Sequence, residues 1–242
     1  MTGLVVQDWA SAATAILGGG HHPTQLFRPP PPFHQLGADY DLIMADPPWP
    51  TTMRSPKGEA KSSVSKYGAM PWAAIEALPV GALAGKHCAL WLWVTLPLLL
   101  DGGDPKRHFA GADASRSRVG AVMQAWGFRY VSAIPWLKRK SKGGIAFGTG
   151  YRFRSACELA LVGIKGAPKT SRRERNFIDG LAREHSRKPE AAYAMAERWL
   201  PGGRYCELFS RTPRAGWDTW GEEAGKFEPV AALNAAPLRA AA

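Results

Sequence analysis

Residues 40–49 read Tyr-Asp-Leu-Ile-Met-Ala-Asp-Pro-Pro-Trp, and this stretch decides the fold. Its first six residues form a short apolar run, which the two prolines after Asp46 close with a rigid turn. The pattern predicts a buried β-strand over residues 40–45. In open α/β sheets, ligands bind beyond the carboxyl ends of the strands, so Asp46 is expected at a binding site.

Strand and helix signals alternate along the rest of the chain. Apolar runs predict further strands at 87–94, 130–137, 158–164 and, as the last strand, 204–209, while helical patterns occur at 71–78, 118–126 and 189–200. This alternation predicts an α/β fold with a doubly wound, mostly parallel sheet. We place the domain at residues 38–224, between a flexible N-terminal appendage (1–37) and a disordered C-terminal tail (225–242).

The charge distribution favours a polyanionic partner. The chain has 31 Lys and Arg against 20 Asp and Glu, a net charge of +11. Residues 138–188 hold fourteen basic and four acidic side chains, so this one stretch carries +10. Such a concentration is typical of nucleic-acid binding, and the alternative is an Arg-rich solvated surface. Aromatic side chains suited to base stacking lie within the same stretch, namely Phe147, Tyr151, Phe153 and Phe177.

Several other classes of protein are disfavoured. The three cysteines are far apart and flanked by apolar residues, which indicates buried thiols of a cytoplasmic protein. We expect no metal site, because the chain has no Cys-x-x-Cys pair. We expect no membrane span either, because the longest apolar stretch, at 89–100, is too short for a bilayer of roughly 30 Å.

The turn at Asp46, Pro47, Pro48 and Trp49 carries the chemistry. A plain structural turn is the alternative interpretation. An aromatic amine is a poor nucleophile, and two acceptors that hold its N–H groups make its lone pair available. Asp46 supplies a carboxylate, and Pro47 supplies a carbonyl on a backbone that Pro48 stiffens. Trp49 offers a flat face for a base, so the turn predicts alignment of an aromatic amine with a methyl donor.

These four residues and eight further segments resemble one enzyme family. Residues 40–222 are similar to the amino-methyltransferases that modify adenine N6, in the branch of the eukaryotic messenger-RNA m6A writers and their bacterial and phage relatives. The segments follow the family's order: Tyr67 to Met70, Leu90 to Thr95, Trp126 to Tyr130, Trp136 to Lys138, Glu158 to Gly163, His185 to Glu190, Glu207 to Arg211, and Gly216 to Gly221.

The resemblance implies a Rossmann-like fold that binds S-adenosyl-L-methionine. Asp46 would hold the target amine beside the methionine end of the cofactor, and Lys188 would contact that same end. Glu207 and Arg211 would hold the ribose, with Gly221 and Glu222 near the adenine. The chain departs from the eukaryotic members at Thr212-Pro213, where they have His-Asn, and at Glu222-Glu223, where they have Asn-Gln.

The sequence therefore predicts an adenine-N6 methyltransferase that acts on nucleic acid, with DNA favoured. DNA is favoured because the chain is compact, shows no separate RNA-binding module and resembles the short bacterial and phage members. An RNA methyltransferase and a catalytically silent binding subunit are the alternatives, and a homodimer is left open. We expect loops at 50–66 and 169–183 to close over the target base. The expected substrate contacts are Tyr67, Lys138, Arg139, Tyr151, Arg154, Arg172, Arg173 and Arg175.

Overall fold

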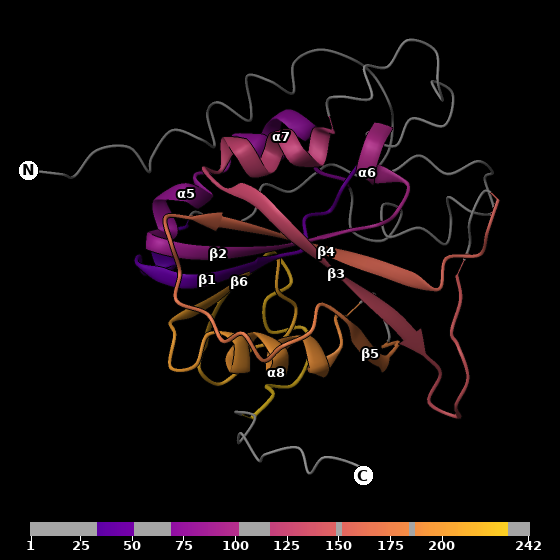
Figure 1. The fold of residues 1–242 in the computed structure, drawn as a ribbon. Helices are drawn as coiled ribbons and strands as arrows, with labels where there is room; N and C mark the ends of the chain where they lie inside the picture. The colour runs from indigo at the N-terminus through magenta and orange to yellow at the C-terminus, as the bar shows by residue number, and fades with distance from the viewer. Residues whose placement is uncertain (1–32, 51–68, 102–116, 149–151, 184–186, 232–242) are drawn as a thin grey trace, which may run out of the picture.

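The computed structural model describes residues 33–50, 69–101, 117–148, 152–183 and 187–231 (Figure 1). In this part of the chain, seven strands form one sheet in the order β5-β3-β4-β2-β1-β6-β7. In chain order the strands are β1 (Tyr40–Ala45), β2 (Ala84–Val94), β3 (Arg129–Arg139), β4 (Cys157–Lys165), β5 (Ile178–Leu181), β6 (Tyr205–Leu208) and β7 (Trp217–Trp220).

The sheet is mostly parallel, as predicted. Strand β1 pairs in parallel with β2 on one side and with β6 on the other, and the pairs β3–β5 and β6–β7 are also parallel. Strand β4 runs antiparallel to both of its neighbours, β2 and β3. The prediction that 204–209 holds the last strand was wrong, because β7 follows it and extends the sheet beyond β6.

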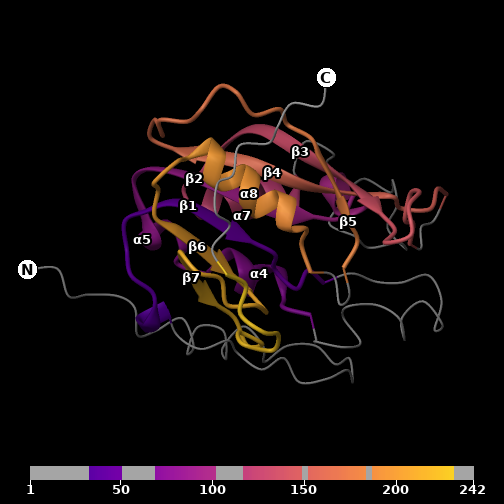
Figure 2. The same cartoon turned by 90° about the horizontal axis from the view of Figure 1, so that it is seen from below.

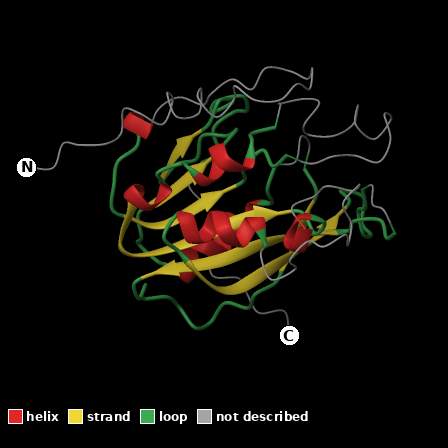
Figure 3. Cartoon of the chain, turned by 90° about the horizontal axis from the view of Figure 1, so that it is seen from above, coloured by secondary structure: helices red, strands yellow, loops and turns green. Residues whose placement is uncertain are grey.

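Helices cover both faces of the sheet (Figures 1 and 2). One face carries α4 (Trp72–Glu76), α5 (Val80–Leu83), α6 (Leu98–Asp101) and α7 (Arg118–Ala125), and the other carries α8 (Glu190–Trp199). Because side chains alternate along a strand, Leu90 and Leu92 belong to the core under α7, whereas Trp91 and Trp93 belong to the core under α8. The same layers are visible from above in Figure 3.

Residues at both edges of the predicted domain contact β7 or the segment that precedes it. The short 3₁₀ helix η1 (Phe33–Gln35) lies in the expected appendage, yet Phe33 is buried and its ring meets Trp220 edge to face at 4.6 Å. In the expected tail, the N–H of Val230 donates to the carbonyl of Pro213 at 2.9 Å. Residues 1–32, 102–116 and 232–242 lie outside the described residues.

The cysteines are free thiols. Burial raises the pKa of the Cys88 thiol to about 12 and also raises the pKa of Cys206, whereas Cys157 is only partly buried. Within the described ranges, no helix has the length and apolar character needed to cross a membrane. The same ranges hold no cluster of three or more His, Cys, Asp or Glu side chains arranged to bind a metal ion.

The burial of Phe33 predicts that the folded domain includes η1. Replacing Phe33 with Ala should lower the free energy of unfolding by about 3 kcal/mol, because it removes a buried ring and its contact with Trp220. The neighbouring exposed Gln35→Ala should change it by less than about 0.5 kcal/mol. Urea unfolding measures both values, and equal stability of the two variants would show that η1 is not part of the core.

Candidate active site

The candidate site lies where the order of the strands reverses. Strand β1 leads to β2 on one side, while β6 and β7 continue the sheet on the other. A pocket with about 380 Å³ of empty space, partly open to solvent, lies at the carboxyl ends of β1 and β6. This is where open α/β sheets bind ligands. The pocket is lined by Asp46, Arg183, Arg187, Lys188, Glu190, Tyr193, Glu207, Phe209, Arg211, Thr212 and Arg214.

Asp46 and Lys188 form the ion pair at the centre of this site. Asp46 directly follows β1, and its backbone N–H donates to the carbonyl of Leu208 in β6 at 3.4 Å. Its carboxylate lies 3.0 Å from the ammonium of Lys188, two residues before α8. The Asp46 side chain is 26% exposed and that of Lys188 is 6% exposed, so the carboxylate faces the pocket while the ammonium is buried.

Glu158 of β4 binds the other side of the same ammonium. Its carboxylate lies 2.9 Å from Lys188 and 2.5 Å from Lys138, and the Lys188 ammonium also lies 5.1 Å from the centre of the Trp93 ring. Burial alone would lower the pKa of Lys188, but the carboxylates of Asp46 and Glu158 outweigh it and raise that pKa. Burial would raise the pKa of Glu158, yet the two lysines hold it at about 2.

The Asp-Pro-Pro-Trp turn is fixed by hydrogen bonds from both sides. The N–H of Trp49 donates to the carbonyl of Pro47 at 2.8 Å, and the N–H of Met70 donates to the carbonyl of Pro48 at 2.9 Å. The Trp49 indole N–H donates to the carbonyl of Trp93 in β2 at 2.9 Å. Only 6% of Trp49 is exposed, and its ring packs on that of Trp72. Trp49 therefore holds the turn against the end of β2.

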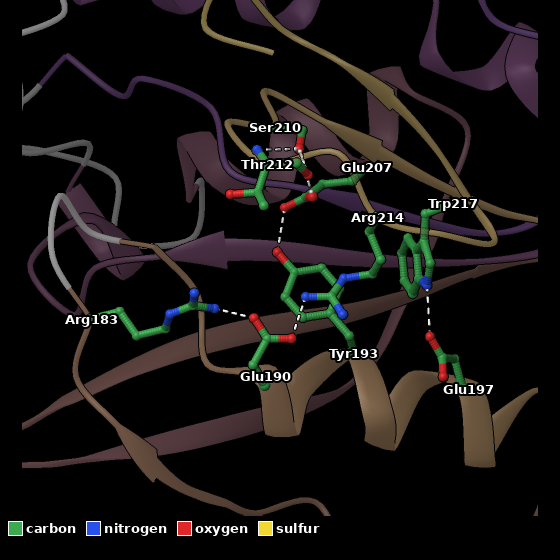
Figure 4. Close-up of polar contacts among 9 residues, drawn as sticks. All are labelled: Arg183, Glu190, Tyr193, Glu197, Glu207, Ser210, Thr212, Arg214 and Trp217. Atoms are coloured by element: carbon green, nitrogen blue, oxygen red, sulfur yellow. Dashed lines mark hydrogen bonds and ion pairs between the residues drawn. The ribbon is translucent and has the colours of Figure 1, made fainter. Parts of the chain in front are cut away.

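Glu207 of β6 is held inside a polar network that lines part of the pocket (Figure 4). The hydroxyl of Tyr193 donates to one carboxylate oxygen at 2.6 Å, and that of Ser210 donates to the other at 2.8 Å. The Arg214 guanidinium lies 3.8 Å from the centre of the Tyr193 ring and pairs with Glu190, which also pairs with Arg183. The network thus joins β6, α8 and the segment after β5.

Burial governs the protonation of this network. It raises the pKa of Glu207, and the hydrogen bonds from Tyr193 and Ser210 offset only part of that effect. Burial and the neighbouring Glu207 raise the pKa of Tyr193 well above its usual range, so the phenol stays a hydrogen-bond donor. Each oxygen of Glu207 already accepts one hydrogen bond and retains a lone pair for a ligand hydroxyl.

The other predicted cofactor residues lie around β7. Arg211 lines the pocket, and its Nε lies 3.3 Å from the carboxylate of Glu223. Gly221 is buried, and a Cβ at this position would lie only 2.7 Å from the carbonyl oxygen of Ser210. Glu222 is exposed and does not line the pocket.

The predicted substrate contacts are divided between two places. Lys138 and Arg139 lie at the end of β3, where Lys138 pairs with Glu158 and Arg139 makes two 2.7 Å hydrogen bonds to Asp179. Arg154 is exposed, with its guanidinium 5.0 Å from the centre of the Phe147 ring. Tyr67 and Tyr151 lie outside the described residues, as do most of the predicted 50–66 loop and residues 184–186.

The exposed Arg172, Arg173 and Arg175 lie at the opposite end of α8 from the pocket. The N–H of Ser171 donates to the carbonyl of Trp199 at the end of this helix, and Glu174 pairs with Arg198. A helix of ten residues spans about 15 Å. The structure therefore does not bring these three arginines to Asp46, although Arg183 of the same predicted loop lines the pocket.

Sequence reasoning did not predict several residues of the site, among them Glu158, Glu190, Tyr193 and Arg214. Glu158 and Glu190 lie in segments that carry the family resemblance, whereas Tyr193 and Arg214 lie in none of those segments. Tyr193 had a usable signal, because it lies three residues after Glu190 and so on the same face of the predicted helix. Nothing local to Arg214 predicts its contact with that helix.

Comparison with known proteins agrees with this architecture. A protein-family model described as MT-A70 matches residues 40–223. The putative N(6)-adenosine-methyltransferase MT-A70-like protein of Medicago truncatula is 34% identical over 189 residues, which are 76% of this chain and 26% of that protein. The chain thus spans about a quarter of the length of this plant relative.

Two other relatives are shorter. The N(6)-adenine-specific methyltransferase METTL4 of Homo sapiens is 24% identical over 79% of this chain and 39% of its own length. The type II methyltransferase M.MunI of Mycoplasma sp. is 28% identical over 76% of this chain and 77% of its own length. The matched residues run from β1 to the residues just after β7 and include the whole described pocket, so the chain belongs to the MT-A70 family.

Proposed function

We propose that this chain transfers a methyl group from S-adenosyl-L-methionine to the exocyclic N6 amine of adenine in nucleic acid. The observation that carries the proposal is the Asp46 carboxylate, held beside Lys188 at the rim of the pocket where the strand order reverses. Membership of the MT-A70 family supports the same reaction, as do the names of the plant and human relatives, an adenosine-methyltransferase-like protein and an adenine-specific methyltransferase.

The side chains of the pocket fit such a cofactor. Glu207 can accept hydrogen bonds from two ribose hydroxyls, because both of its oxygens have spare acceptor capacity. The cation of Lys188 suits the carboxylate of the methionine end, and Arg211, which also lines the pocket, would hold the ribose together with Glu207. Gly221 allows two segments of backbone to pack closely, because a Cβ there would clash with the carbonyl of Ser210. The adenine end is proposed to lie beside Gly221 and Glu222. When bound, the cofactor supplies an electrophilic methyl group on a sulfonium.

Asp46 and Pro47 are proposed to hold the target amine. The Asp46 carboxylate would accept one N–H of the amine and the Pro47 carbonyl the other, which draws the nitrogen lone pair out of the ring. The Pro47 carbonyl already accepts the N–H of Trp49, so the N–H of the amine would bond to the second lone pair of that carbonyl oxygen. The Lys188 ammonium fixes the carboxylate without any rearrangement during the reaction, which is the condition for electrostatic catalysis.

Trp49 and Pro48 are proposed to act through the shape of the turn as well as through contact. Trp49 would border the base next to Asp46, through the 6% of the residue that is exposed. Because Trp49 is buried and bonded to β2, its removal would also leave a cavity. Asp46 is therefore the better position for a test of the chemistry.

The first experiment replaces Asp46 with Ala. We expect less than about a tenth of wild-type turnover, which corresponds to a loss above roughly 1.4 kcal/mol of transition-state stabilisation. The fold should survive, because Lys188 keeps Glu158 as a partner. The matched control is Asp179→Ala, which removes an exposed carboxylate on β5. Turnover of Asp46→Ala within tenfold of the control would contradict the role of Asp46.

We further propose that the nucleic acid is DNA. The described residues form one sheet and its covering helices without a separate RNA-binding module. The chain also matches most of the length of the type II methyltransferase, but only a quarter of the adenosine methyltransferase-like plant protein. The opposite assignment has support in a relative from Cryphonectria parasitica that is named an RNA methyltransferase. An intact Asp46 and Lys188 pair argues against a silent binding subunit.

The second experiment compares methyl transfer to DNA and RNA oligonucleotides of one adenine-containing sequence, single- and double-stranded, at equal salt. We expect transfer to DNA to be fastest, and unpaired DNA to be the better form, because extrusion of a paired base costs a few kcal/mol. Nucleoside analysis of the product identifies the methylated base. Faster transfer to RNA than to either DNA form would overturn the DNA assignment.

A further inference from the structure

The connection between β3 and β4 is a separate basic element. We call its described residues 140–148 and 152–156 the hairpin tip. Residues 138–154 contain six Lys and Arg and no Asp or Glu. Lys140, Lys142, Arg152 and Arg154 are exposed on the tip. The tip continues past the carboxyl end of β3, beyond the sheet (Figure 1).

The hairpin tip is folded back on its own strands. The N–H of Lys140 donates to the carbonyl of Gly144 at 3.1 Å, and the N–H of Ala146 donates to that of Lys138 at 2.8 Å. Further on, the N–H of Gly148 donates to the carbonyl of Ser155 at 2.9 Å. Gly143 and Gly144 have φ of 88° and 78°, a conformation that glycine adopts readily and other residues rarely do. The tip thus presents its side chains from a defined backbone.

Large apolar side chains are exposed on this tip among the cations. Ile145, Phe147 and Phe153 are 47%, 51% and 89% exposed. The Lys140 ammonium and the Arg154 guanidinium each lie 5.0 Å from the centre of the Phe147 ring. Exposed rings interleaved with cations suit a ligand that has both flat aromatic faces and negative charge, which is the composition of an unpaired nucleic-acid strand.

The root of the hairpin is linked directly to the candidate site. Lys138 pairs with Glu158, Glu158 pairs with Lys188, and Lys188 pairs with Asp46. A strand lying on the tip would therefore reach the Asp46 side of the pocket by way of the carboxyl edge of the sheet. The arginines at the far end of α8 have no such link, since Ser171 contacts Trp199 at the end of that helix.

We propose that the hairpin tip binds the unpaired strand next to the target base. Its bases would stack on Phe153 and Phe147, and its phosphates would contact Lys140, Lys142, Arg152 and Arg154. A second copy of this chain fits the tip poorly, because two tips without acidic residues would repel each other. The inference rests on the proposed function for its target base, but it concerns binding alone.

The test measures binding of the full chain to a labelled single-stranded DNA oligonucleotide and to its duplex by fluorescence anisotropy. The variant is Phe147→Ala with Phe153→Ala, and the matched control is Tyr130→Ala, which removes a 56% exposed ring at the start of β3, outside the tip. We expect the double variant to raise the dissociation constant for the single strand at least about tenfold, since each stacked base is worth at least several-fold. The control should stay within about twofold.

Two further readouts separate stacking from charge and from association. The double variant keeps every cation, so the dependence of binding on salt should be unchanged, whereas Lys142→Glu with Arg152→Glu should flatten it. The duplex should lose much less affinity than the single strand. An equal loss on both forms, an effect no larger than that of Tyr130→Ala, or no binding by the wild type would overturn the proposal. So would a wild-type dimer that the double variant converts to a monomer.

The same samples distinguish this inference from the proposed function. Affinity for S-adenosyl-L-methionine should be equal in the wild type and the double variant, because the tip does not line the pocket. A selective loss of single-strand binding in a protein that transfers no methyl group to adenine would support the tip and refute the proposed function. If the wild type methylates adenine but the double variant shows no selective loss of single-strand binding, the proposed function is supported and the role of the tip is refuted.

Discussion

The buried ammonium of Lys188 is the interaction on which the site depends. It joins three segments that are far apart in the sequence, because Asp46 follows β1, Glu158 begins β4 and Lys188 precedes α8. Loss of the ammonium would leave the carboxylates of Asp46 and Glu158 without their shared partner, and breaking a buried ion pair in this way costs about 3–5 kcal/mol. The same contacts orient the Asp46 carboxylate toward the pocket, so the stability of this edge of the sheet and the proposed chemistry have one cause.

The ionisation of Glu158 depends on two lysines, Lys138 and Lys188. Its pKa of about 2 means that folding stabilises the carboxylate relative to the unfolded chain, where the ordinary value is 4.5. This stabilisation is present above pH 4.5 and is lost as the pH falls toward about 2. At neutral pH, Glu158 therefore remains charged and keeps Lys188 in position beside Asp46.

Local patterns in the sequence predicted the longer elements but missed several of the short ones. Strand β1 was predicted with its observed bounds, because an apolar run closed by two prolines has few other interpretations. The strands β5 and β7 have only four residues each, and their places depend on pairing with β3 and β6. The burial of Phe33 was also not predictable from local sequence, because its ring packs on Trp220, at the other end of the domain.

The basic stretch shows what charge counting leaves out. The sequence presents residues 138–188 as one patch, but Lys138 and Lys188 are in buried or half-buried ion pairs, and Arg139 and Arg183 pair with acidic partners. The exposed cations then fall into two groups, on the hairpin tip and at the end of α8. Ion pairing between distant segments is a property of the fold, and no spacing along the chain encodes it.

The most direct measurement is a structure of the chain with an unreactive analogue of S-adenosyl-L-methionine and an adenine-containing strand. We predict that the N6 nitrogen of the target adenine lies within hydrogen-bonding distance of both the Asp46 carboxylate and the Pro47 carbonyl. The Lys188 ammonium should still bridge Asp46 and Glu158. A target base whose amine contacts neither Asp46 nor Pro47 would contradict the proposal that these two residues hold the target amine.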